Sequence, residues 1–168
     1  LSVYPPGSIF KLITLSAVLE EKLKGLNEVI KCDGSFVLGN RVAKCWMEKG
    51  HGDLNILEGL VWSCDVVFYK LGLIAGATNM AKYAEKFGLG NKTGVDLPAE
   101  KKGFIPTENW KKKTFGEPWV KGDSINMAIG QGFIQVTPLQ MANVYATIAV
   151  SERYKPFVLK EIISKDGV

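Results

Sequence analysis

The sequence has few cysteines and histidines, and it has no long uninterrupted apolar segment. Its 168 residues include three cysteines, one histidine and seven prolines. Lys, Glu or Asp interrupts every apolar run before the roughly eighteen residues that a membrane-spanning helix needs. No internal repeat and no long linker divides the chain, so we expect one domain. Apolar residues make up 46% and charged residues 23%, which excludes disordered and fibrous classes.

Net charge gives little indication of a partner. The formal charge is +4, and we expect the basic excess to lie mainly on a solvated face, although it would also suit an anionic membrane surface or a phosphate-bearing substrate. The lysines are not interleaved with a nucleic-acid-binding motif, so no nucleic-acid partner is expected. Much of the excess comes from Lys101, Lys102, Lys111, Lys112 and Lys113.

Hydrophobic periodicity predicts a mainly helical chain with a few short strands. The expected helices cover residues 8–24, a segment that begins at Asn55, and residues 65–74, 78–87 and 137–150. The expected strands cover residues 36–38, 41–43 and 157–163. Residues 90–122 are rich in glycine, proline and lysine, so we expect them to run mostly as ordered loop over the surface. Asn55 with Glu58, and Thr137 with Gln140, have the spacing of capping boxes.

A Pro-Pro-Gly breaker stands directly before Ser8, and Lys11 follows three residues later, in the segment YPPGSIFKL. A hydroxyl is a weak nucleophile near neutral pH unless a base lies beside it. The spacing places Ser8 and Lys11 on one helical face, and the first turn of a helix favours developing negative charge. The pattern therefore predicts a serine nucleophile with a lysine base, but a helix start with a solvated lysine has the same spacing.

Several segments together resemble the class B penicillin-binding proteins of the rod-elongation type. YPPGSIFK is similar to their first active-site motif, with Ile9 where threonine is usual. Ser63-Cys64-Asp65 is similar to the S-x-D form of their second motif. Other similar segments are GHGDLN at 50–55, FGLGNKTGVDLPAE at 87–100, PTENWK at 106–111, GDSI at 122–125 and GQGFIQVTPLQMA at 130–142.

The third motif of that family, K-T-G or K-S-G, lies on a strand that faces the nucleophile. Lys92-Thr93-Gly94 has the right letters, but it follows the second motif too closely and belongs to the FGxGxxTGxDLP segment. We interpret it as a coincidence. The sequence ends before the position of the family's third motif, so we expect residues 1–168 to be a partial transpeptidase domain, truncated at both ends and impaired in activity on its own.

The resemblance implies an α+β fold of the penicillin-binding protein and serine β-lactamase type, mostly the helical lobe with an incomplete antiparallel sheet. It implies a peptidoglycan D,D-transpeptidase that crosslinks stem peptides through a Ser8 acyl-enzyme and is covalently inhibited by β-lactams. In that reaction Lys11 would accept the proton of Ser8, and Ser63 would relay a proton toward the leaving D-Ala. Asp65 would hold Lys11 and Ser63 in place.

The same resemblance implies a parent protein anchored in the cytoplasmic membrane through a segment outside this chain, with its catalytic domain on the outer, periplasmic face. Elongation-complex scaffold proteins and a glycosyltransferase would be its partners in cell-wall synthesis and cell shape. A serine β-lactamase is disfavoured because no E-x-x-L-N segment supplies a hydrolytic base. A β-lactam sensor, or a non-catalytic folded module that binds zinc, stays open as an alternative.

All three cysteines and the only histidine fall in one window, at Cys32, Cys45, His51 and Cys64. They make a complete Cys₃His set, which suits structural zinc, while the chemistry itself would need no cofactor. Asp33 could replace Cys32 as the fourth ligand. A Cys32–Cys45 disulfide with Cys64 as a buried thiol, or four unlinked side chains, also agrees with the sequence. Because Cys64 is the middle residue of the second motif, a metal bound to it would hold that motif in place.

Overall fold

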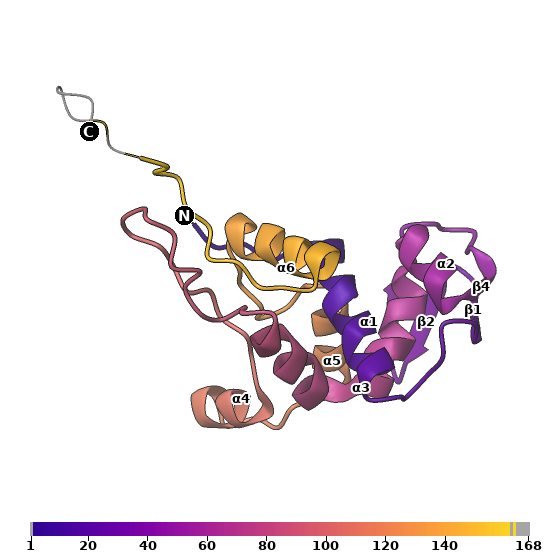
Figure 1. Cartoon of the computed structure of the whole chain (residues 1–168). Helices are drawn as coiled ribbons and strands as arrows, with labels where there is room; N and C mark the ends of the chain where they lie inside the picture. Colours follow the sequence, from indigo (N-terminus) through magenta and orange to yellow (C-terminus); the bar gives the residue numbers. More distant parts are fainter. Residues whose placement is uncertain (1, 162, 164–168) are drawn as a thin grey trace.

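The computed structural model describes residues 2–161 and 163. In this range the chain forms α-helices, short strands and one 3₁₀ turn (Figure 1). The helices are α1 (Lys11–Glu20), α2 (Ile56–Val61), α3 (Asp65–Lys86), α4 (Glu108–Phe115), α5 (Lys121–Ala128) and α6 (Pro138–Val150). The strands are β1 (Val29–Cys32), β2 (Ser35–Leu38), β3 (Arg41–Lys44) and β4 (Gly52–Asn55), and the 3₁₀ turn η1 covers Gly7–Phe10.

The long helix α3 is the centre of the core and packs against both α1 and α5 (Figure 1). Side chains from all three helices are fully buried here, including Ile13, Phe68 and Ile125. The closest approach of α3 to α5 is at Gly72, where a Cβ would lie 2.3 Å from the Cβ of Ala128. Only glycine fits there, so the sequence sets the distance between these two helices.

Two separate antiparallel strand pairs form the sheet part of the fold. Strand β1 pairs with β4 in the register Cys32↔Gly52, and β2 pairs with β3 in the register Leu38↔Arg41. These strands lie with α2 at one end of the molecule, on the right in Figure 1. Strands at 36–38 and 41–43 are confirmed, whereas β1 and β4, with the sequences VIKC and GDLN, were not predicted.

Several predicted helices are confirmed with corrected bounds. The helix expected at 8–24 starts as the η1 turn and ends at Glu20, because the backbone leaves the helical region at Lys22, where φ is 52°. The helices expected at 65–74 and 78–87 are two halves of α3, separated by the non-helical Gly76. Both capping boxes are present, at the starts of α2 and α6.

One prediction about extended structure is wrong, and one about irregular structure missed a helix. Residues 90–122 run mostly as loop, as expected, but they also contain α4 and the start of α5. Helix α4 has its own signals, since Thr107 caps its first turn and Gly116 ends it with a φ of 72°. The strand expected at 157–163 is absent from residues 157–161 and 163, where the structure describes no neighbouring strand, and residue 162 lies outside the described residues.

Among the described helices, none combines the length and the hydrophobicity that crossing a membrane requires.

Candidate active site

Ser8 lies in the η1 turn, directly before α1, and its side chain is exposed. The Gly130-Gln131-Gly132 segment holds this turn in place, because Gly7 N donates to Gly130 O at 2.9 Å. A Cβ on Gly130 would lie 2.2 Å from Gly7 O, so the two backbones are in direct contact. This packing explains why a glycine-rich turn far along the sequence belongs to the site of Ser8.

Lys11 is buried at the start of α1, and its ammonium group makes contacts with both outer residues of the second motif. Its Nζ lies 2.7 Å from Asp65 Oδ1, 2.8 Å from Ser63 O and 3.0 Å from Ser63 Oγ. The Lys11 side chain is 1% exposed and that of Asp65 is 17% exposed. A charge this deeply buried needs such partners, because transfer out of water is costly.

The structure therefore brings Lys11, Ser63 and Asp65 together, as the motifs predict, with Ser8 one helical turn away. A backbone hydrogen bond joins Ser8 and Lys11, in which the Lys11 N–H donates to Ser8 O. The Ser8 hydroxyl makes no hydrogen bond within the described part of the chain. Ser8 is thus exposed, whereas Lys11, three residues later, is buried.

Ser63 adopts a strained backbone between α2 and α3. Its φ of 50° lies in the left-handed region, which side chains other than glycine rarely adopt. Such a conformation costs about 1–3 kcal/mol and persists only where the surroundings impose it. Ser63 N and Cys64 N donate to Leu60 O and Gly59 O, which keeps the turn closed.

Sequence reasoning missed Trp46, which also contacts the second motif. Its backbone N–H donates to Asp65 Oδ2 at 3.2 Å, and its indole Nε1–H lies 3.1 Å from Trp62 O and 3.2 Å from Ser63 O. No sequence pattern could have indicated these contacts, because Trp46 lies in a loop without periodicity.

The K-T-G segment at residues 92–94 is irregular loop and not a strand. Thr93 N, Thr93 Oγ1 and Gly94 N all donate to the carboxylate of Glu100, at 2.7, 2.6 and 3.0 Å. Burial raises the pKa of Glu100, but these hydrogen bonds outweigh it and hold the pKa below its ordinary value. Thr93 is thus engaged in local hydrogen bonds with Glu100. This agrees with the interpretation that the match of residues 92–94 to the third motif is a coincidence.

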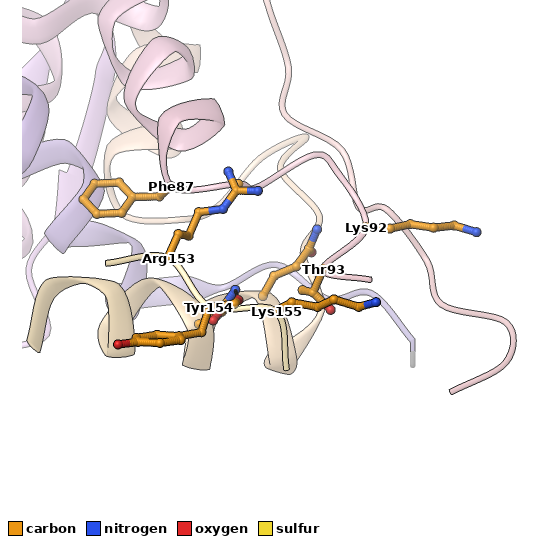
Figure 2. Close-up of a pocket in the computed structure, with 9 residues that line it drawn as sticks. Phe87, Lys92, Thr93, Arg153, Tyr154 and Lys155 are labelled. Atoms are coloured by element: carbon orange, nitrogen blue, oxygen red, sulfur yellow. Dashed lines mark hydrogen bonds between the residues drawn. The ribbon is translucent and has the colours of Figure 1, made fainter. Parts of the chain in front are cut away.

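A small polar pocket lies beside this loop, and Lys92, Thr93, Arg153 and Lys155 are among its lining residues (Figure 2). None of the residues predicted to be catalytic lines it. Figure 2 shows the Lys92 side chain extending away from the pocket, so the positive charges of the lining residues do not converge on one point.

The Cys₃His set predicted from the sequence is assembled in space. The ligand atoms of Cys32, Cys45, His51 and Cys64 all lie within 4.8 Å of one another. His51 Nδ1 is 3.6 Å from the Sγ atoms of Cys32 and Cys45, and the Sγ atoms of Cys45 and Cys64 are 4.0 Å apart. Tetrahedral zinc with Zn–S bonds of about 2.3 Å spaces its ligand atoms about 3.8 Å apart, so the set fits zinc.

Two of the competing arrangements, the disulfide and the Asp33 ligand, do not match the structure, whereas four unlinked side chains also agree with it. All three cysteines are free thiols, so the structure contains no Cys32–Cys45 disulfide. Asp33 is exposed and pairs with Lys31 at 3.0 Å, outside the cluster. His51 Nε2 is buried and has no hydrogen-bond partner among the described residues.

The protonation of two cysteines depends on their surroundings. Burial raises the pKa of the Cys64 thiol to about 12. Burial also raises the pKa of Cys32, but hydrogen bonds with His51 and Gly34 outweigh it and bring the pKa down to about 7. A buried thiol such as Cys64 becomes a thiolate readily only beside a strong positive charge, which a metal ion would supply.

Comparison with known proteins decides the family. Residues 1–167 match the family described as the penicillin binding protein transpeptidase domain. The chain belongs to this family. The family and the α+β transpeptidase fold predicted from the motifs are thus confirmed.

The similar proteins are longer than the chain. Peptidoglycan D,D-transpeptidase MrdA of Acinetobacter baumannii is 38% identical over 149 residues, which is 88% of the chain and 22% of that protein. MrdA of Escherichia coli strain K12 is 36% identical over 142 residues, 83% of the chain and again 22% of the relative. The chain thus spans about a fifth of the length of these curated relatives.

Solved structures show the same fold. The complex between PBP2 and MreC from Helicobacter pylori superimposes with a TM-score of 0.88 at 36% identity, and the match covers 92% of the chain and 29% of that structure's chain. Pseudomonas aeruginosa PBP2 in complex with WCK 5153 also gives a TM-score of 0.88, at 29% identity, over 95% of the chain and 35% of its own.

Proposed function

We propose that the chain is part of a peptidoglycan D,D-transpeptidase, and that residues 1–168 form part of its transpeptidase domain. The observation that carries this proposal is the cluster of buried Lys11 with half-buried Ser63 and Asp65, one helical turn from the exposed Ser8. The names of the curated relatives support the substrate class.

In the first step Ser8 Oγ attacks the carbonyl carbon between the two terminal D-Ala residues of a stem peptide. Its proton passes to Lys11 as the new C–O bond forms. An ammonium group has three N–H donors, and the three acceptors around Lys11 would use all of them. Lys11 therefore acts as the base when it is a neutral amine, whose lone pair can take the proton.

In the second step the peptide C–N bond breaks and the terminal D-Ala leaves as an amine. Ser63 Oγ, 3.0 Å from Lys11 Nζ, gives a proton to this amine and receives one from Lys11. The acyl group stays on Ser8. An amine from a neighbouring stem peptide then attacks the ester carbonyl, a new amide C–N bond forms as the crosslink, the C–O bond to Ser8 breaks, and the proton lost by the amine goes to Ser8 Oγ. A β-lactam acylates Ser8 by the same attack, with its ring amide as the bond that breaks.

The oxyanion that forms on the carbonyl needs two donors. The N–H of Ser8 supplies one, and the strand with the third motif supplies the other in this family. No K-T-G or K-S-G follows the G-Q-G segment in the sequence. Because loss of one oxyanion donor costs about a hundredfold or more in rate, we expect residues 1–168 alone to react slowly.

We also propose that Cys32, Cys45, His51 and Cys64 bind one structural zinc ion. Zinc would neutralise the buried thiolates and join β1, the following loops and the second motif, and it would take no part in the reaction. Metal analysis of the purified protein should give one zinc per chain. A Cys45→Ser variant should lose it, and an equal metal content in both would contradict the site.

For the whole protein we propose an anchor in the cytoplasmic membrane and a catalytic domain on the outer, periplasmic face. Scaffold proteins of the elongation complex and a glycosyltransferase are the proposed partners, together with a role in cell shape. Two solved relatives support the partners: PBP2 in a complex with MreC, and a peptidoglycan synthase complex described as coordinating polymerization and crosslinking.

The test of the function uses peptidoglycan strands that carry pentapeptide stems. The whole protein that contains this chain should release D-Ala and produce crosslinked muropeptides, which mass spectrometry identifies. A Ser8→Ala variant of equal thermal stability should produce neither. Release of D-Ala without crosslinks would indicate a hydrolase, and no product from the wild type would refute the proposed activity.

A further inference from the structure

The second motif is held from two sides, by Lys11 from within and by Trp46 from the loop after β3. Trp46 contacts both reactive residues of the motif, through its backbone N–H to Asp65 Oδ2 and its indole N–H to Ser63 O. The indole N–H is also 3.1 Å from Trp62 O, so one side chain spans two successive carbonyls.

Hydrophobic burial does not explain this placement of Trp46. The residue is 56% exposed, so much of its indole ring remains in water. Its polar contacts are the three hydrogen bonds, and its ring also packs edge-on against His51, with ring centroids 5.1 Å apart. An exposed tryptophan is thus oriented by polar contacts that end on the second motif.

The carbonyl of Ser63 accepts hydrogen bonds from both Lys11 and Trp46. It accepts from Lys11 Nζ at 2.8 Å and from Trp46 Nε1 at 3.2 Å. Ser63 has the left-handed backbone described above, with a φ of 50°. Such strain persists only where contacts hold it. The indole N–H is one such contact, and it acts on the residue whose hydroxyl relays the proton.

We propose that Trp46 is a positioning residue of the transpeptidase reaction. Its indole N–H holds the Ser63 backbone in the conformation that keeps Ser63 Oγ within reach of Lys11 Nζ. Trp46 itself touches no reacting atom. This inference rests on the proposed function, because its effect is on the acylation of Ser8.

The test removes the indole N–H and keeps the ring. In the whole protein, Trp46 is replaced by benzothienylalanine, in which sulfur stands where the indole has N–H. Stopped-flow measurement with a fluorescent penicillin separates the dissociation constant of the first complex from the acylation rate constant. We expect the acylation rate constant to fall about tenfold, equivalent to about 1.4 kcal/mol. The dissociation constant should stay within twofold of the wild type.

Trp119 provides the matched control, because its indole Nε1–H also makes one hydrogen bond, to Ser124 Oγ at 2.9 Å. The same replacement at Trp119 should leave the acylation rate constant unchanged. Metal content and melting temperature are measured for all three proteins, and both should match the wild type in the Trp46 variant.

Three outcomes would overturn the inference. An acylation rate constant within twofold of the wild type would show that the indole N–H is not needed. A fall accompanied by loss of metal, or by an equal fall in the Trp119 variant, would show a general structural effect. If wild-type protein is not acylated at Ser8 at all, the proposed function fails first and the inference fails with it.

Discussion

Replacing Lys11 with methionine tests whether the buried ammonium and the Asp65 carboxylate stabilise each other. The two groups are 2.7 Å apart, with side chains 1% and 17% exposed. Removing one partner of a buried pair costs about 3–5 kcal/mol, because the remaining charge loses its compensation. Asp65 keeps some contact with water and the N–H of Trp46, so we expect the lower end, about 3 kcal/mol in the free energy of unfolding.

A double-mutant cycle separates the charge effect from lost packing. Adding Asp65→Asn to Lys11→Met removes the stranded charge, so the double variant should be more stable than Lys11→Met, by about 1–2 kcal/mol. Urea unfolding followed by tryptophan fluorescence gives all four free energies, provided that the slope with urea stays constant. If the two single changes simply add, the ion pair is not what stabilises Lys11 in the core, and the reasoning is refuted.

Further predictions concern the metal, the core and the buried glutamate. A chelator should lower the melting temperature and the penicillin-labelling rate together, and added zinc should restore both, since Cys64 lies inside the second motif; unchanged values would contradict the zinc site. Gly72→Ala should lower the free energy of unfolding by about 1–3 kcal/mol, because the new Cβ would clash with Ala128; an unchanged urea midpoint would contradict the α3–α5 packing. The folded-state pKa of Glu100 lies below 4.5, so its stabilising effect is complete above that pH and is lost as the pH falls through the folded-state pKa. Urea unfolding of Glu100→Gln should therefore show a deficit at neutral pH that disappears in acid, whereas a deficit independent of pH would count against this account.

The features that the sequence predicted well depend on short-range rules. The capping boxes at Asn55 and Thr137 are both set by a spacing of three residues. Such spacings place side chains together as soon as the helix forms. The cysteine window was visible because its residue types are rare in this chain, although only the fold shows that their ligand atoms meet.

The features that were missed depend on contacts between distant residues or on mixed local signals. Trp46 meets Ser63 only because the loop after β3 folds back onto the start of α3. Helix α4 carries a Thr107 cap and a terminal Gly116, but its run of lysines weakens the apolar pattern that would reveal it. The early end of α1 at Glu20 reflects a backbone turn at Lys22. No glycine or proline at that position indicates the turn in the sequence.

The central claim is that Ser8 is the acylated nucleophile, and intact-protein mass after exposure to a penicillin tests it most directly. The whole protein should gain the mass of one penicillin, the Ser8→Ala variant should gain none, and residues 1–168 alone should react much more slowly. An adduct that persists in Ser8→Ala, or no adduct on the whole protein, would contradict the account.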